Sequence, residues 1–409
     1  MRYDGSTAGH WFSGASAFQG ALAGLGVLLP ALAASLLPGA AADEPAGSVS
    51  VRDTGSQIGP ASYECTFGHK VDTHLITLDS GAVRYTFRYS GCTDASHGDL
   101  RPSAEGNFGM PEPTSGNWYW GGFLRVLING KDAIGYRQTD MRAIETGARG
   151  AFQAIWAHPD ADVGARFLML PGGNHVLAYL TWRPKPGAKI DSVLVNLRCY
   201  PSFFTAPHHR QGERHCQTPR ANEREPKTLE LVPAKDPYLY YYDAVFDVAK
   251  GEGDGPCAAL VNPQGVKAGR VHIGDYAVST DLEYPPEAGQ ARLAFYDFTG
   301  KTNAEAEAYL KAHWAEDLAQ LVQTDFRPEP VRLLQADRLQ SEATKLLADA
   351  ADDGKALQPK VNELLSRVAA LRAKAGQGDW QAEADLATAL QDSADLFWRL
   401  RAFALLNGP

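Results

Sequence analysis

The sequence lacks most of the features by which protein classes are recognised. One of these is clusters of basic residues. No run of Lys or Arg is longer than two residues, and the 409-residue chain carries a formal net charge of -9. Proteins that bind nucleic acid neutralise its phosphates with clustered Lys and Arg, so a nucleic-acid partner is excluded. An anionic membrane surface is disfavoured for the same electrostatic reason.

Motifs for catalysis and redox chemistry are missing as well. The sequence has no G-x-S-x-G elbow, H-E-x-x-H helix, Walker loop or dinucleotide fingerprint, which disfavours the common serine hydrolases, zincins and nucleotide enzymes. It has no C-x-x-C pair, so thioredoxin-type chemistry and zinc ribbons are not expected. We therefore expect no cofactor and assign no metal ligand.

Long apolar segments are also scarce, since only residues 21–42 are apolar enough to insert into a membrane. The segment ends in small residues at Ala40 and Ala42, the pattern that signal peptidase cleaves, and Asp43 would begin the mature chain. The segment before it is long, polar and only weakly basic, which is unusual for a signal peptide. A retained N-terminal anchor is therefore the alternative to cleavage. In both cases we expect the protein to be exported to the periplasm, the cell surface or the medium.

Cysteines are few and leave their own pairing open. There are five, namely Cys65, Cys92, Cys199, Cys216 and Cys257. An oxidising compartment permits disulfides, and Cys65–Cys92 and Cys199–Cys216 are the local pairs that would close short segments between neighbouring strands. Buried free thiols are an equal alternative, because cysteine also packs as a small hydrophobic residue.

What the sequence does contain is strand-like alternation. Val83, Tyr85, Phe87 and Tyr89 alternate with polar residues, and the same period of two returns in residues 163–169 and 191–199. Residues 117–128 and several later segments are further predicted strands, and Asn129-Gly130 is typical of a tight hairpin turn. We expect a mainly β fold, with a large, super-sandwich-like antiparallel β-sandwich over residues 61–300 after a polar linker over residues 43–60.

The pattern changes to helical spacing near residue 300. Thr302 and Glu305 form a capping-box signature, Pro359 suits the first turn of a helix, and Asp379 suits an N-cap. Gly354 and Gly376 would end two of the segments. Residues 301–409 are therefore expected to form a module of about four amphipathic helices, through which the protein could oligomerise.

The densest polar segment lies at residues 207–216. It holds the donor types that zinc prefers, namely His208, His209, Glu213, His215 and Cys216. All of them come from one loop, whereas closed metal sites usually draw pairs of ligands from two rigid arms. A solvated loop is the plain interpretation. The functional one makes His208, His209 and Arg210 catalytic residues, with a histidine as general acid or base.

Aromatic clusters are the second candidate feature. Trp118, Tyr119 and Trp120 precede two glycines, and Tyr240, Tyr241 and Tyr242 precede Asp243. Aromatic rings beside polar side chains suit the apolar face and the hydroxyls of a sugar, so Trp118, Trp120, Tyr242 and Asp243 are the candidate substrate-binding residues. The competing interpretation places most of these rings in the core between sheets.

We therefore expect an exported carbohydrate-binding or carbohydrate-modifying protein, with its site at the strand-end loops and a carbohydrate as partner. This expectation is an analogy with other large sandwiches, because one fold serves many functions. A non-catalytic component of the cell envelope, of adhesion or of an assembly is the alternative. A metal-dependent hydrolase using residues 208–216 is the second alternative.

Overall fold

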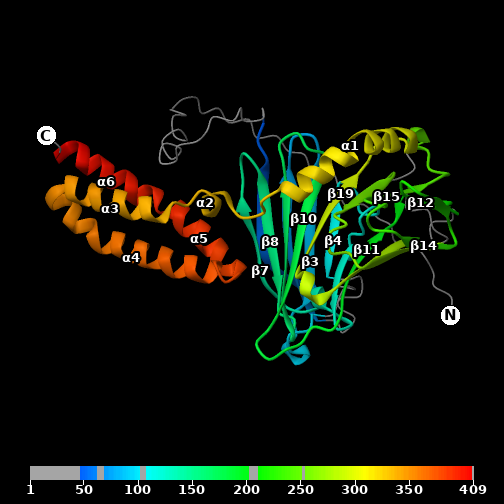
Figure 1. The fold of residues 1–409 in the computed structure, drawn as a ribbon, viewed down its shortest axis with the longest axis horizontal. Helices are drawn as coiled ribbons and strands as arrows, with labels where there is room; N and C mark the ends of the chain where they lie inside the picture. The colour runs from blue at the N-terminus through cyan, green and yellow to red at the C-terminus, as the bar shows by residue number, and fades with distance from the viewer. Residues whose placement is uncertain (1–46, 62–68, 102–106, 202–210, 251–253, 408–409) are drawn as a thin grey trace. The chain divides into compact units, whose positions relative to one another are not determined.

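The computed structural model describes residues 47–61, 69–101, 107–201, 211–250 and 254–407. Within them the strands form three sheets, and every pairing between named strands is antiparallel (Figure 1). The prediction of a mainly β fold with a C-terminal helical stretch is confirmed.

The strands follow one another in each sheet in a definite spatial order. The four-stranded sheet contains β1 (Ser50–Ala61), β2 (Lys70–Asp79), β3 (Arg84–Cys92) and β4 (Phe108–Glu112). The six-stranded sheet contains, in spatial order, β14 (Lys227–Leu231), β17 (Ala268–Ile273), β18 (Val278–Tyr284), β11 (Val193–Cys199), β5 (Leu124–Ile128) and β6 (Lys131–Asp132). The nine-stranded sheet contains β13 (Asn222–Arg224), β12 (Arg214–Gln217), β15 (Tyr238–Asp243), β16 (Cys257–Val261), β19 (Gln290–Asp297), β10 (His175–Pro184), β9 (Ala161–Met169), β8 (Gly150–Trp156) and β7 (Gln138–Glu145).

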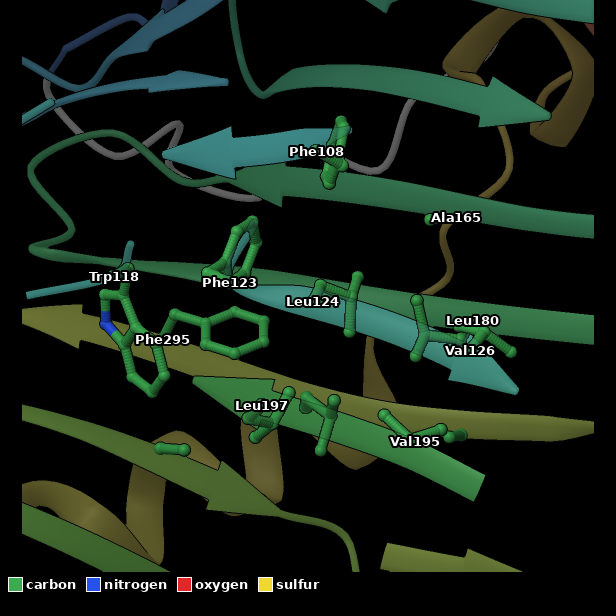
Figure 2. Packing of buried hydrophobic residues seen from close by; sticks show 14 of the residues in the cluster. Phe108, Trp118, Phe123, Leu124, Val126, Ala165, Leu180, Val195, Leu197 and Phe295 are labelled. Atoms are coloured by element: carbon green, nitrogen blue, oxygen red, sulfur yellow. The ribbon is translucent and has the colours of Figure 1, made fainter. Parts of the chain in front are cut away.

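The core lies between the nine-stranded sheet and the other two. Phe87 of β3 lies 4.5 Å from Phe167 of β9 between ring centroids, and Phe123 lies 5.3 Å from Phe295 of β19. Figure 2 shows Phe123, Phe295 and Leu197 of β11 in this packed layer. The predicted alternation explains the arrangement, because every second residue of β11, from Val193 to Cys199, is buried. Burial of the apolar surface of these rings and edge-to-face contact between rings stabilise the fold.

The predicted hairpin turn is confirmed between β5 and β6. Asn129 has a φ of 51° and Gly130 a φ of 77°, the two positive values that a tight type I′ turn requires. The side chain of Asn129 also accepts a hydrogen bond from the backbone N–H of Asp191, at 2.8 Å. The turn residues therefore fix the register of β5 against β6 and contact the start of the neighbouring strand.

Two boundaries predicted from the sequence are wrong. Residues 43–60 were expected to be a linker, yet β1 pairs along most of its length with β2. Its period is hidden by two register shifts and by Gly55, whose positive φ marks a bulge. The strand expected over residues 117–128 begins only at Leu124, because the chain makes turns after Trp118.

The helices are α1 (Asn303–Gln323), α2 (Glu329–Arg332), α3 (Ala336–Asp349), α4 (Ala351–Ala375), α5 (Trp380–Asp392) and α6 (Ala394–Asn407). The capping box of Thr302 with Glu305 and the N-cap of Asp379 are confirmed. The expected count of about four helices is wrong for the described chain. Pro359 lies inside α4 rather than at its start, and the last predicted helix is divided into α5 and α6 at Ser393.

Two helices cover the face of the nine-stranded sheet that points away from the core. α1 lies over the nine-stranded sheet near β15 and β19 (Figure 1) and also contacts β16. It buries Leu310 and Leu321 against the sheet. Trp380, the first residue of α5, packs so closely on β9 that a Cβ added to Gly164 would lie 2.9 Å from its ring. The outer face of this sheet is therefore largely buried, which the alternation of its strands does not reveal.

The predicted Cys199–Cys216 disulfide is wrong. Both residues are buried free thiols, and they come from strands of different sheets whose inner faces meet in the core. Cys257 of β16 is a third buried thiol in this layer. The alternative interpretation, cysteine as a small core residue, therefore holds for these three. The other predicted pair includes Cys65, which lies outside the described residues.

Asp297 of β19 places a carboxyl group inside the core, and its environment predicts a pH effect. It accepts hydrogen bonds from Asn117 at 2.9 Å, Thr114 at 3.0 Å and Thr299 at 2.6 Å. Burial nevertheless raises the pKa of Asp297 to about 6. Between pH 4 and pH 6, Asp297 is therefore protonated in the folded state but ionised in the unfolded state. The contribution of its protonated carboxyl to the free energy of unfolding is fully present below this window and is lost as pH rises through it.

We expect the free energy of unfolding of the wild type to fall, relative to Asp297→Asn, by up to about 3 kcal/mol as pH rises from 4 to 7. The difference between the two proteins removes the titration of all other groups. Urea unfolding at pH 4, 5, 6 and 7 measures it. Parallel pH profiles for the two proteins would show that Asp297 does not titrate in this window.

Candidate functional site

The three predicted catalytic residues, His208, His209 and Arg210, lie outside the described residues. Their acid–base role therefore stays a prediction. The described part of that segment begins at residue 211 and enters β12 at Arg214.

The arrangement of β12 contradicts convergence of His215 and Cys216 on one metal ion. Successive side chains of a strand point to opposite faces. The imidazole of His215 lies on the outer face, stacked on Tyr242 with ring centroids 4.8 Å apart, whereas Cys216 is buried in the core. A metal-dependent hydrolase built on this segment could therefore not use His215 and Cys216 together as ligands of one ion.

Of the predicted aromatic ligands, Trp118 is wrong and Trp120 remains accessible. Trp118 is fully buried, packs against Phe295 and donates its Nε1–H to the carbonyl of Tyr296 at 2.8 Å. Trp120 is half-buried, with the Arg88 guanidinium 5.3 Å from its ring centroid. Trp118 is thus a core residue and cannot contact a ligand at the surface.

Asp243 is also misassigned, whereas Tyr242 lies at a pocket. The Asp243 side chain is buried, and its Oδ1 accepts hydrogen bonds from the backbone N–H groups of Glu213 at 2.9 Å and Val245 at 3.0 Å. It therefore holds the turn after β15 rather than a substrate. The alternation expected for this strand is confirmed, since Tyr240 and Tyr242 lie on the outer face and Tyr241 lies in the core.

A pocket of about 550 Å³ lies between the outer face of β12, β13 and β15 and the first turns of α1. We call it the β15–α1 pocket. The residues that matter for its chemistry are Gln217, Arg220, Asn222, Tyr240, Tyr242 and Glu307.

Aromatic rings form one side of the β15–α1 pocket. The rings of Tyr240 and Tyr242 lie 5.2 Å apart at an interplanar angle of 21°, and the imidazole of His215, opposite Tyr242 on the neighbouring strand, also stacks on Tyr242. Asn222 fixes the edge of this row, because its Nδ2 donates to the Tyr242 hydroxyl at 2.9 Å. The row is therefore rigid, with the polar edge of Tyr242 at the pocket.

Planar polar groups from three elements surround the rings. Gln217 of β12 donates its amide to Oε1 of Glu307 on α1 at 2.7 Å, and Lys311 approaches the same oxygen at 2.5 Å. These contacts lower the pKa of Glu307, Lys311 more than Gln217, so its carboxylate stays ionised at neutral pH. An ionised carboxylate beside two amides offers acceptors and donors within one pocket.

Arg220 supplies the positive charge of the pocket. Its guanidinium contacts both carboxylate oxygens of Asp236, with its Nε 3.0 Å from each. Burial alone would raise the pKa of Asp236, but the hydrogen bonds from Arg220, the Val232 backbone and Thr218 together outweigh it and hold the pKa below its ordinary value. The pair keeps the guanidinium at the pocket wall in a fixed orientation.

Most residues of this pocket could not be predicted from the sequence. Gln217, Asn222 and Glu307 are ordinary polar residues spread over 90 positions, and only the fold brings them together. Tyr242 is the one predicted binding residue at the pocket. Glu307 is the only carboxylate among the described lining residues, whereas glycoside hydrolysis by the common route needs two.

Large apolar side chains are exposed on α6. Trp398, Leu405 and Leu406 of α6 are exposed, by 56%, 84% and 79%. The alternative of an assembly component rests on this exposure. Among the described helices none is long and apolar enough to cross a membrane.

Comparisons with known proteins give distant likenesses. No protein-family model matches the chain, and no curated protein matches it by sequence. Solved structures do align with it, at low identity. An α-N-acetylgalactosaminidase of Bifidobacterium bifidum, crystallised as a quadruple mutant, is 12% identical with a TM-score of 0.33, over 68% of this chain and 41% of its own. The GH36 α-galactosidase AgaA of Geobacillus stearothermophilus is 11% identical with a TM-score of 0.31, over 55% and 40%.

Another is a TPR-domain containing protein of Parabacteroides distasonis, 8% identical with a TM-score of 0.34, over 84% of this chain and 80% of its own. The chain thus spans about two fifths of the length of the two glycosidases. Likeness at this level says nothing about activity, so the function has to be argued from the residues of the β15–α1 pocket.

Proposed function

We propose that the protein binds a carbohydrate in the β15–α1 pocket. The observation that carries this proposal is the convergence of the Tyr242 edge, the Asn222 and Gln217 amides and the Glu307 carboxylate on one open pocket. A sugar presents adjacent hydroxyl groups that donate and accept at once, and such planar groups satisfy both roles. The tyrosine row supplies apolar contact for the C–H face of the ring.

Binding without turnover follows from the same residues. The pocket holds one described carboxylate, and that carboxylate is already paired with Lys311. A general acid needs a pKa raised toward the working pH, whereas the pKa of Glu307 is lowered. We therefore assign Glu307 to the recognition of hydroxyl groups and not to proton transfer.

A glycan array followed by calorimetry tests the proposal. Asn222→Ala and Glu307→Gln each remove one polar partner of the ligand, and we expect each to weaken binding about 10- to 100-fold. Glu363→Gln is the matched control, because Glu363 is exposed on α4 and lies far along the chain from the pocket. It should bind as the wild type does.

Two results would contradict the proposal. One is the absence of any glycan bound by the wild type. The other is a glycan whose affinity is the same for the wild type and for the Asn222→Ala/Glu307→Gln double variant. Circular dichroism of each variant confirms that a loss of binding is not a loss of fold.

A further inference from the structure

A second group of side chains lies apart from the pocket, on the four-stranded sheet. His69 directly precedes β2, Cys92 is the last residue of β3, and His97 ends the short 3-10 helix η2 (Ala95–His97). The three donor atoms all lie within 4.8 Å of one another. Backbone pairing explains the meeting, because Val71 is opposite Cys92 and the N–H of Thr93 donates to the carbonyl of Lys70 at 3.0 Å.

The spacing of these atoms fits a single metal ion. Sγ of Cys92 lies 3.5 Å from Nδ1 of His69. A tetrahedral zinc ion with ordinary bond lengths places a thiolate sulfur and an imidazole nitrogen about 3.6 Å apart. The rings of His69 and His97 are inclined at 46° with centroids 5.6 Å apart, and one nitrogen of each lies within 4.8 Å of the other and of the Cys92 sulfur.

Asp94 orients the first of these ligands. Its Oδ2 lies 3.1 Å from Nε2 of His69, so the imidazole carries its proton on that nitrogen and turns the lone pair of Nδ1 toward Cys92. A carboxylate behind a histidine ligand is the usual support of a metal-bound imidazole. The Oδ1 of Asp94 also accepts from the N–H of Ser96 at 2.7 Å and so caps η2, the turn that carries His97.

We propose that His69, Cys92 and His97 bind a divalent metal ion of the zinc class, with Asp94 as the positioning residue. Two imidazoles and one thiolate are borderline-soft donors that suit zinc, whereas calcium and magnesium require oxygen ligands. On binding, the thiol of Cys92 loses its proton to solvent and its sulfur bonds to the metal. The ion joins β2, β3 and η2, and therefore stabilises this end of the sheet.

The competing assignment is a nucleophilic thiol, because a cysteine, a histidine and a carboxylate in a row also resemble a catalytic triad. Cys92 is only 1% exposed, and a reactive thiol needs access to its substrate. That assignment also leaves the second imidazole, His97, without a role. The metal site explains all four side chains.

Metal analysis of the full chain, purified without a histidine tag, tests the proposal. After dialysis with zinc and then against buffer we expect about one ion per chain. Cobalt in place of zinc should give a thiolate-to-cobalt charge-transfer band that Cys92→Ser abolishes. Asp94→Asn should weaken the zinc affinity about 10- to 100-fold. His272→Ala, an exposed histidine on β17, is the control and should change neither the band nor the affinity.

A measurement on the wild type alone guards against variants that fail to fold. Zinc should slow the alkylation of Cys92 by iodoacetamide, followed by peptide mass spectrometry, and should raise the thermal midpoint. The proposal is overturned if the wild type takes up no zinc, or if Cys92→Ser and His97→Ala bind it unchanged. Rapid alkylation of Cys92 that zinc does not slow would overturn it in favour of the nucleophile. Cys92 recovered in a disulfide would overturn it as well.

Discussion

Replacing Glu383 with alanine is expected to lower the free energy of unfolding by about 3–5 kcal/mol, because it leaves the buried guanidinium of Arg166 without its counter-charge. Arg166 is 1% exposed on the outer face of β9, and its Nη2 lies 3.2 Å from Oε2 of Glu383 on α5. The ring of Trp380 covers the guanidinium, with the ring centroid 4.3 Å from Cζ.

The remaining contacts of Arg166 cannot replace the carboxylate. Gln153 accepts from Nη2 at 3.1 Å and the carbonyl of Phe326 accepts from Nη1 at 3.3 Å, but both are neutral. Burial lowers the pKa of Arg166, and Glu383 opposes that effect. An arginine nevertheless stays protonated in proteins. Glu383→Ala therefore leaves an unpaired charge buried in the folded state, which lowers the free energy of unfolding.

Asp385→Ala is the matched control, because Asp385 lies on the same helix and pairs with Arg142 at 2.9 Å, yet is 36% exposed. Its loss should cost no more than about 1 kcal/mol. The double variant Arg166→Met/Glu383→Leu removes both charges and should recover most of the lost stability. Urea unfolding followed by tryptophan fluorescence measures all three. Equal losses for Glu383→Ala and Asp385→Ala would show that the buried pair has no special role.

Replacing Trp118 with alanine is expected to cost about 3–5 kcal/mol of unfolding free energy, and to do so whether or not a ligand is present. The ring fills the core between Phe123, Tyr241 and Phe295, at centroid distances of 6.2, 5.9 and 5.0 Å. Its removal opens a cavity and deletes the hydrogen bond to the Tyr296 carbonyl, which adds about 1 kcal/mol.

Two further variants separate the contributions. Trp118→Phe keeps most of the apolar volume but loses the hydrogen bond, so its cost should be clearly smaller. Trp398→Ala removes the same side chain from an exposed position on α6 and should change stability by no more than about 0.5 kcal/mol. A Trp118→Ala protein as stable as Trp398→Ala would contradict the core assignment and return Trp118 to the candidate ligands.

The sequence could predict which residues of the strands face the core, but not whether the residues on the opposite face are buried or exposed. In β9, Val163, Ala165, Phe167 and Met169 share a face as expected, and all are in the core. The alternate residues Arg166 and Leu168 are buried too, because α5 and α1 cover them. A charged residue in an alternating pattern indicates a solvent face, and only the docking of a helix that begins more than 200 residues later reverses that indication.

The candidate sites divide in the same way. Local pattern was enough for the outward position of Tyr242, the capping box at Thr302 and the Asn129-Gly130 turn, because each depends on neighbours within a few residues. It failed for Trp118, where a turn interrupts the expected strand, and for Asp243, whose carboxylate is used by the backbone of the next turn.

By itself, the sequence determined the extended, alternating character of the described strands between residues 61 and 300 and the helical character of the described residues after them, since both follow from short-range periodicity. The tertiary structure alone decided that Gln217 meets Glu307 and that His69 meets Cys92 and His97. Those meetings depend on strand order and on helix docking. Strand order and helix docking produce no periodic pattern in the sequence. A single polar residue at a distant position therefore gives no information about its partner.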